Sequence, residues 1–224
     1  MSINNDIVQL AIRGILKTAV LEEARTIHNQ TAGNPAGVAA ARALGDLSHN
    51  VFVPLGDAKD AASELLILDL WNSVEGLGKF FSDPQVQAGG DMIFAKRDPV
   101  VWQAAGARGF VLPTPAGRAQ RFVGLIRGTV KSRDAALAAF DTLERQSINA
   151  GRLVGQISHQ IFFRLTPPGT PPSLELCGVD VWMDAEGMTK FYQDGSHNSL
   201  LADVFTGPPA TSVWKQPAGS WVEW

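Results

Sequence analysis

The sequence contains one cysteine, Cys177, among 224 residues. An internal disulfide is therefore excluded, and so is a metal site built from several thiolates. Cys177 lies in the apolar run LELCGVDV, which predicts a buried side chain rather than a reactive thiol. Long apolar runs are missing, and the stretch MSINNDIVQLAIRG lacks a basic segment followed by an apolar one. We therefore expect no membrane association and a cytoplasmic location.

Dense basic clusters are also missing. The net charge is -3, and no group of Lys and Arg is dense enough to neutralise a row of phosphates, which argues against a nucleic-acid partner. No glycine-rich phosphate loop follows a predicted strand, so nucleotide binding is unsupported. The four histidines never fall at the local spacing of metal ligands. With 45% hydrophobic and 18% charged residues, the composition is typical of a soluble globular protein.

The chain contains an internal repeat. The stretches DLWNSVEGLGKFFSD from Asp69 and DVWMDAEGMTKFYQD from Asp180 are identical at seven of fifteen positions, at an offset of 111 residues. Two further pairs of stretches match in the same order: AIRGILKT with LIRGTVKS, and RALGDLSHNVF with RLVGQISHQIF. Because the similarity extends through nearly the whole chain, we expect two copies of one structural unit.

The repeat also predicts the domain boundaries. We place the first repeat at residues 1–106, a linker at 107–120 and the second repeat at 121–224. The linker, ARGFVLPTPAGRAQ, contains two prolines and no periodic apolar pattern, as expected for a connection between domains.

Each repeat has the pattern strand, helix, strand, strand, helix, strand. In the first repeat the apolar residues of 7–17 predict a strand, and Thr18 is placed to cap the helix that follows. Ser132 has the same place in the second repeat. Ser73 and Asp184 are expected to cap the second helix of each repeat. This order predicts an α+β protein of two ferredoxin-like βαββαβ repeats, each with both helices on one face of an antiparallel sheet.

The third strand is apolar on both of its faces. In the stretch ELLILDLW, Leu66 and Leu68 share one face, while Leu65 and Ile67 share the other. Since the helices cover only one face, the other face needs a partner, and the second repeat can supply it. We expect the two repeats to pack sheet to sheet in one chain, as a monomeric pseudo-dimer, with a homodimer as the alternative.

Two ferredoxin-like units packed through their sheets resemble the dimeric α+β barrel superfamily. The stretch DLWNSVEGLGKFFSDP is similar to a motif of its antibiotic-biosynthesis monooxygenase-like members, with a Trp at the end of the third strand and a Glu at the start of the helix. The resemblance covers both repeats and implies a tandem fusion. The superfamily includes cofactor-free monooxygenases, haem-degrading enzymes, isomerases and proteins without a known activity, so the fold does not select the reaction.

The resemblance also suggests residues for a ligand pocket. It places Trp71 and Trp182 on the pocket wall, although core packing explains both tryptophans equally well. Haem-degrading members carry a histidine ten residues after this tryptophan, where this chain has Phe81 and Tyr192, and this argues against haem. We expect no cofactor and no metal, and we assign these four residues to the binding of a small apolar or aromatic ligand.

Three kinds of polar residue recur at matching positions of the two repeats: His49 and His159, Arg13 and Arg127, and Asp69 and Asp180. The histidines lie among apolar residues of the second strand and are either buried and neutral or bases that accept a phenolic proton. The aspartates share a face with the tryptophans, where they need a partner or line the pocket. The arginines lie on the neighbouring strand, so an Arg to Asp ion pair across the sheet is one solution and a pocket role is the other.

We therefore expect a cofactor-independent, monooxygenase-like enzyme that acts on a small aromatic or hydroxylated compound. The catalytic candidates are His49, His159, Arg13 and Arg127, and Asp69 and Asp180 join the ligand-binding residues. The alternatives are a non-catalytic ligand-binding or structural protein of the same fold, and an isomerase or lyase that needs no oxygen. Trp221 and Trp224 lie beyond the repeat, and we expect them to cover a pocket or an interface.

Overall fold

The computed structural model describes residues 7–111, 120–194, 201 and 203–224. The chain divides into two compact units. The first-repeat unit contains the residues up to Gln103 together with Trp214–Trp224, and the second-repeat unit contains Ala104–Val213.

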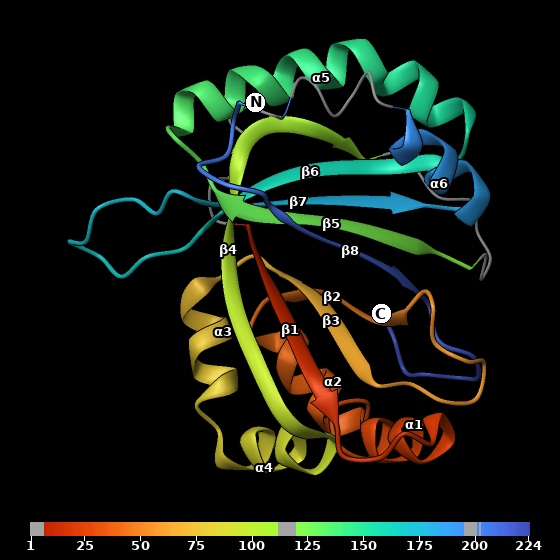
Figure 1. Ribbon diagram of the computed structural model, residues 1–224. Helices are drawn as coiled ribbons and strands as arrows, with labels where there is room; N and C mark the ends of the chain where they lie inside the picture. Colours follow the sequence, from red (N-terminus) through yellow and green to blue (C-terminus); the bar gives the residue numbers. More distant parts are fainter. Residues whose placement is uncertain (1–6, 112–119, 195–200, 202) are drawn as a thin grey trace. The chain divides into compact units, whose positions relative to one another are not determined.

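The first-repeat unit has the predicted order of elements, with an additional helix after each of its two predicted helices (Figure 1). Its elements are β1 (Val8–Leu16), α1 (Leu21–Gln30), α2 (Pro35–Ala43), β2 (Asp46–Pro54), β3 (Glu64–Trp71), α3 (Val74–Phe81), α4 (Pro84–Ile93) and β4 (Phe94–Val111). The strands pair in the order β4–β1–β3–β2, and the β1–β4, β1–β3 and β2–β3 pairs are antiparallel. This is the strand order of a ferredoxin-like sheet.

The described residues of the second-repeat unit have the same order of strands, with one helix, Arg133–Leu153, in the place of α1 and α2. The elements of this unit are β5 (Phe122–Thr129), α5 (Arg133–Leu153), β6 (Gln156–Arg164), β7 (Glu175–Trp182), α6 (Ala185–Gln193) and β8 (Ala210–Lys215). The strand order β8–β5–β7–β6 repeats that of the first-repeat unit. The long helix α5 runs across the sheet of this unit (Figure 1). The predicted α+β fold with two ferredoxin-like repeats is confirmed.

Two strands contribute residues to both units. Residues 104–111 of β4 belong to the second-repeat unit, and Trp214 and Lys215 of β8 pair with Pro54 and Val53 in the first-repeat unit. The compact units therefore differ from the proposed boundaries, because β4 extends through residue 111 and the segment after β8 packs on the first repeat. The proposed linker, 107–120, comprises the end of β4 and residues 112–119, which lie outside the described residues.

The predicted helix caps are confirmed at three positions. Ser73, Ser132 and Asp184 each accept a hydrogen bond from a backbone N–H in the first turn of the following helix. The predicted Thr18 cap is wrong. Val20 is the N-cap residue of α1, and the Thr18 hydroxyl instead donates to Glu23. The inserted stretch NQTAGNPAG divides the first helix of this repeat into α1 and α2: Thr31 is the C-cap of α1, and Asn34 and Pro35 start α2.

The register of β3 decides which side chains face the helices. Leu10 lies opposite Asp69, and His49 lies opposite Asp69 on the other side, so all three point to the helix-covered face. Arg13 lies opposite Leu66 and points to the other face. The face covered by the helices therefore carries the histidines and aspartates, and the opposite face carries the arginines.

A β-bulge near the start of β2 changes the alternation of its side chains. The register shifts between Asp46 and Ser48, so Asp46 lies opposite Trp71 on the same face as His49. Leu47, which simple alternation places beside His49, is half exposed. The same shift occurs at Gln156 in β6.

Candidate functional site

A cavity of about 480 Å³ lies in the second-repeat unit, where α5 and α6 cover the sheet. Its walls are mainly apolar and include Phe140, Leu143 and Phe191. The polar side chains on the wall come from both helices and the sheet: Glu144, Ser147, Gln156, His159, Asp180 and Tyr192. A volume and lining of this kind suit a small, mostly apolar ligand that is oriented by a few polar groups.

A connected set of hydrogen bonds holds these polar groups in place. The Asp180 carboxylate binds His159 Nδ1 at 2.6 Å through Oδ1 and accepts the Tyr192 hydroxyl at 2.7 Å through Oδ2. The Trp182 indole Nε1–H in turn donates to the Tyr192 hydroxyl oxygen at 3.2 Å. Because Asp180 receives both partners, the imidazole and the phenol are fixed relative to one another.

The carboxylate controls the protonation of both neighbours. Burial by itself lowers the pKa of His159, but the charge and hydrogen bond of Asp180, with a contribution from Glu144, raise it above its ordinary value. Burial and the Asp180 charge raise the pKa of Tyr192 well above its ordinary value. Tyr192 is therefore a neutral hydrogen-bond donor, and His159, with its pKa raised above 6.5, is the candidate for proton exchange in this network.

Two glycines provide much of the space in the cavity. Gly124 and Gly178 line it on neighbouring strands, at the positions where the first repeat has Leu10 and Ile67. A Cβ atom at Gly124 would lie 2.1 Å from the Tyr192 hydroxyl, so any larger residue would displace this side chain. The open volume is therefore specific to the sequence of the second repeat.

The first repeat builds a related network that is more deeply buried. His49 Nδ1 binds Asp69 Oδ1 at 2.8 Å, as His159 binds Asp180, and His49 Nε2 lies 2.9 Å from His28 Nε2. His28 Nδ1 continues the chain to Asn29 Oδ1 at 3.0 Å. The Asn29 amide is oriented by Val222, whose backbone N–H donates to the same Oδ1.

These contacts assign the protons. Since Asn29 Oδ1 is an acceptor, His28 Nδ1 carries a proton and His28 Nε2 accepts from His49. His49 then donates from both ring nitrogens, which makes it an imidazolium beside the Asp69 carboxylate. The pKa shifts agree. Burial and the charge of His49 lower the pKa of His28 to about 4, whereas Asp69 outweighs the effect of burial and raises the pKa of His49.

Asp46 adds a second buried carboxyl group to this network. Burial and the nearby Asp69 charge raise its pKa to about 7, against the opposing effect of His49. The Trp224 indole lies close enough to lower the pKa of Asp46, yet Asp46 Oδ1 and Trp224 Nε1 lack a hydrogen-bond partner among the described residues. The surroundings of Asp46 in the folded protein thus disfavour its charged form.

We expect Asp46→Asn to stabilise the protein more at pH 8 than at pH 5. An unfolded aspartate loses its proton near pH 4, but folded Asp46 keeps it until about pH 7, so the wild type loses stability as pH rises through this interval. The asparagine variant does not titrate and keeps its stability there. Thermal unfolding at both pH values measures the difference. Asp91→Asn, at a largely exposed carboxylate, is the control, and an equal change at both pH values would contradict the assignment.

No protein-family model and no curated protein sequence matches this chain. Many solved structures are similar in fold, and three of them show the range of their activities. An anthrone oxidase-like protein matches with a TM-score of 0.62 and 14% identity, over 97% of this chain and 94% of that chain. A chlorite dismutase variant from Candidatus Nitrospira defluvii matches with a TM-score of 0.55 and 8% identity, over 96% and 92% of the two chains. A monooxygenase-like protein from Listeria innocua matches with a TM-score of 0.53 and 8% identity, over 97% of this chain and 98% of that chain.

The chain shares the ferredoxin-like α+β fold of these solved structures. The matches extend over nearly the whole chain, which fits a tandem fusion of two ferredoxin-like domains. The activities named for these three structures differ from one another, so at such low identity the likeness shows the fold alone.

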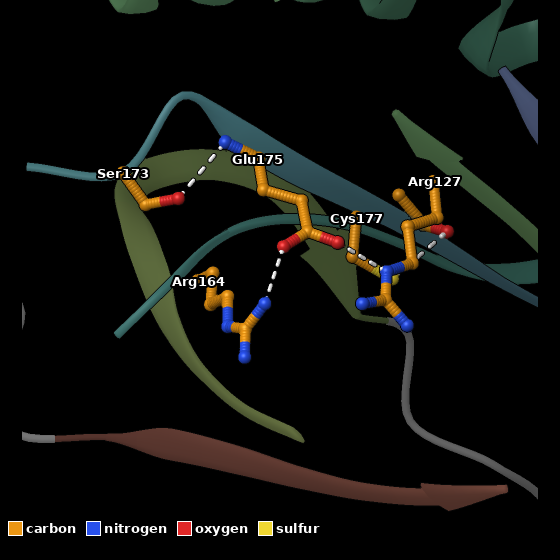
Figure 2. A network of polar contacts seen from close by, with 6 residues as sticks. Arg127, Arg164, Ser173, Glu175 and Cys177 are labelled. Atoms are coloured by element: carbon orange, nitrogen blue, oxygen red, sulfur yellow. Dashed lines mark hydrogen bonds and ion pairs between the residues drawn. The ribbon is translucent and has the colours of Figure 1, made fainter. Parts of the chain in front are cut away.

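The two candidate arginines, Arg13 and Arg127, lie away from the cavity. Arg127 binds Glu175 at 2.5 Å on the face opposite His159, and Arg164 binds the other oxygen of the same carboxylate at 3.0 Å (Figure 2). Arg13 binds Glu64 in the first repeat. The predicted Arg to Asp ion pairs are therefore wrong, because strand alternation places the two charges on opposite faces of the sheet.

Cys177 lies beside this ion-pair network (Figure 2). Its side chain is buried, and burial raises the pKa of the thiol to about 12. The thiol is therefore protonated and unreactive at neutral pH, as the sequence predicts.

Among the aromatic candidates, only Tyr192 lies on the cavity wall. Trp182 is fully buried behind it and donates to its hydroxyl group. In the first repeat, Trp71 is fully buried and packs against Phe81 with ring centroids 6.2 Å apart. Both tryptophans thus lie in the core of their own repeat, and Trp182 supports the cavity through its hydrogen bond to Tyr192.

Several residues of the two networks were missed by the sequence analysis. His28 and Asn29 come from α1, and Glu144 comes from α5, so local patterns gave no reason to associate them with the histidines of the sheet. Gln156 reaches the cavity only because of the β-bulge. One signal was available: the repeat aligns Gly178 with Ile67, a change that indicates lost side-chain volume.

Within the described residues, no group of three or more His, Cys, Asp or Glu side chains is arranged to hold a metal ion. No helix in the described part of the chain is long and apolar enough to cross a membrane.

Proposed function

We propose that the second-repeat cavity binds a small hydroxylated aromatic or polycyclic compound and that the protein oxidises it with O₂ without a cofactor. The observation that carries this proposal is the pairing of His159 with Asp180 on the wall of a mainly apolar cavity of about 480 Å³. The similarity of the fold to an anthrone oxidase-like and a monooxygenase-like protein supports the choice of reaction.

The residues of the cavity suit the removal of a proton from a weakly acidic substrate. His159 in its neutral form accepts the proton, and Asp180 stabilises the resulting imidazolium. The Tyr192 hydroxyl donates to the Asp180 carboxylate and accepts the Trp182 N–H, and this chain of hydrogen bonds keeps the imidazole oriented. Phe140, Leu143 and Phe191 surround the aromatic rings and exclude water, which favours electron transfer from the substrate anion to O₂ rather than reprotonation.

The overall reaction balances without an added reductant. For a substrate with an acidic CH₂ group between two rings, as in anthrone, the two hydrogens leave as protons and the carbon is oxidised by four electrons. One oxygen atom of O₂ enters the product as a carbonyl and the other leaves as water. The electrons come from the substrate, so the protein needs only to bind, deprotonate and orient it.

Oxygen uptake with anthrone tests the proposal. We expect one O₂ consumed per anthrone, and a reduction of kcat/KM by about 10–200-fold in Gly178→Val, whose side chain occupies the cavity. A Cβ atom at this position would lie 2.8 Å from the Ile126 side chain, which must shift to admit it. Gly56→Val is the matched control, since no atom lies within 4 Å of a Cβ placed there.

Two outcomes would contradict the oxidation. Unchanged oxygen uptake in a folded Gly178→Val variant would remove the cavity from the reaction. Turnover of a bound compound under anaerobic conditions, together with no uptake of O₂ in air, would instead indicate an isomerase or lyase that uses the same proton-transfer residues.

A further inference from the structure

The segment that follows β8, residues 216–224, covers the His28–His49 network of the first-repeat unit. Trp224 pairs with His49 through two backbone hydrogen bonds of 2.7 and 3.2 Å. The Glu223 carboxylate accepts the Val51 N–H at 2.8 Å, and the Asn29 amide binds the backbone of Ser220 and Val222. This segment is therefore attached to both β2 and α1.

The segment places two indole rings on the two histidines. The Trp224 ring stacks on His49 with a centroid distance of 4.6 Å and an interplanar angle of 21°, and the Arg42 guanidinium lies 5.9 Å from the Trp224 ring. The Trp221 ring lies 5.0 Å from that of His28. Stacking on an imidazole, with a cation near the ring, is a recognition geometry for a planar, electron-rich aromatic compound.

The same location in the second repeat is an open cavity. Each repeat has a His to Asp hydrogen bond between its second and third strands, His49 to Asp69 and His159 to Asp180. In the first repeat, Leu10 replaces Gly124, and the two indole rings lie against the histidines. Both repeats therefore share the His to Asp pair. They differ in the space beside it, which two indole rings occupy in the first repeat and which is a cavity in the second.

The occupation by Trp224 leaves two polar groups unsatisfied. Its Nε1–H and the Asp46 Oδ1 atom are both buried without a hydrogen-bond partner among the described residues. The buried Trp71 Nε1 atom also lacks a partner among the described residues, so the feature particular to Trp224 is the unpartnered Asp46 oxygen beside its ring. The Trp224 indole interacts with Asp46 and lowers its pKa, but the ring stacked on His49 does not bring its N–H into hydrogen-bond geometry with Asp46 Oδ1. A free ligand that is not tied to the backbone can place its donor on this oxygen.

We propose that the first repeat contains a second binding site, for a planar aromatic compound of the indole class with an N–H or O–H donor, and that Trp224 and Trp221 of the same chain occupy it. The Asp46 carboxyl group is the acceptor for the donor of a free ligand, and His49 is the surface on which its ring stacks. This site does not depend on the oxidation proposed for the second repeat.

Indole binding to Trp224→Ala tests the proposal. Removal of this ring opens the site, and indole at ten times its Kd is expected to raise the Tm of the variant by about 3–6 °C. Indene has nearly the same shape but no N–H group, and we expect it to bind about tenfold more weakly in a calorimetric titration because it cannot reach Asp46 as a donor. If Trp224→Ala does not fold, Trp224→Leu, which also removes the ring from His49, is titrated in the same way, with Trp221→Ala beside it to open the space over His28.

Trp71→Ala is the control, since Trp71 is a buried tryptophan of the same unit that packs on Phe80 and Phe81. Equal stabilisation of both variants by indole would show a general filling of cavities and would overturn the proposal. Absence of binding to the folded Trp224 and Trp221 variants would also overturn it. Oxygen uptake measured on the same samples reports the second-repeat cavity separately, so the failure of one proposal does not imply failure of the other.

Discussion

Replacing His159 with glutamine is expected to lower kcat/KM for the proposed oxidation by about 10²–10⁴-fold, because the variant loses the base that removes the substrate proton. Glutamine keeps a polar side chain beside Asp180, so the fold and the affinity for a non-reacting aromatic compound should change little. Steady-state oxygen uptake and a binding titration separate the two effects. A loss of affinity with unchanged kcat would assign His159 to binding alone.

The pH dependence supplies a second readout of the same variant. His159 is active as a base only in its neutral form, and Asp180 raises its pKa above the ordinary value of 6.5. In the wild type, kcat/KM should therefore rise with pH through a midpoint above 6.5, and His159→Gln should lose this rise. His49→Gln is the matched control from the first repeat. His49→Gln is expected to lower Tm but to retain the rise of kcat/KM with pH. Loss of this rise in His49→Gln, and its retention in His159→Gln, would place the proton transfer in the first repeat.

Replacing Asp69 with alanine is expected to lower the free energy of unfolding by about 3–5 kcal/mol, because it leaves the His49 imidazolium buried without its counter-charge. The Asp69 and His49 side chains are 6% and 5% exposed, so solvent cannot replace the lost interaction. Denaturant unfolding monitored by circular dichroism measures the change. Asp91→Ala, which breaks an exposed ion pair with Arg97, is the control and should cost at most about 1 kcal/mol.

The effect of the Asp69 change should depend on pH with a defined sign. The pKa of His49 is raised in the folded wild type, so its contribution to stability is complete below pH 6.5 and is lost as pH rises through the raised value. The difference between Asp69→Ala and the wild type should therefore be largest in acid and decrease in base. A difference that does not vary between pH 5 and pH 9 would show that the carboxylate acts only through packing.

Much of the fold could be predicted because the signals are local. The spacing of apolar residues predicts the strands and helices, and Ser73, Ser132 and Asp184 cap helices as expected. The repeat of 111 residues then doubles the evidence for each element. The prediction that Thr18 caps the first helix was wrong, because Val20 forms a β-bridge with Ala61 and the helix begins after that bridge.

The candidate sites could be predicted only in part. His159, Asp180 and Tyr192 were selected from the sequence, and the structure joins them on one cavity wall. The arginines were selected by the same reasoning about neighbouring strands, but they lie on the other face of the sheet. Sequence spacing shows that two strands are neighbours, whereas the register decides which side chains meet, and a bulge of one residue changes it.

The duplicated fold and the paired His and Asp residues follow from the amino-acid sequence alone, since both depend on periodicity and on the comparison of one repeat with the other. Only the tertiary structure distinguishes the two repeats. It brings His28 within 2.9 Å of His49, places Trp224 on the same imidazole, and leaves the corresponding space beside His159 open. The contacts of the first-repeat network join residues as far apart in the sequence as Asn29 and Val222, which are separated by 193 positions. The packing of side-chain volumes decides which such residues meet, and no local pattern encodes it.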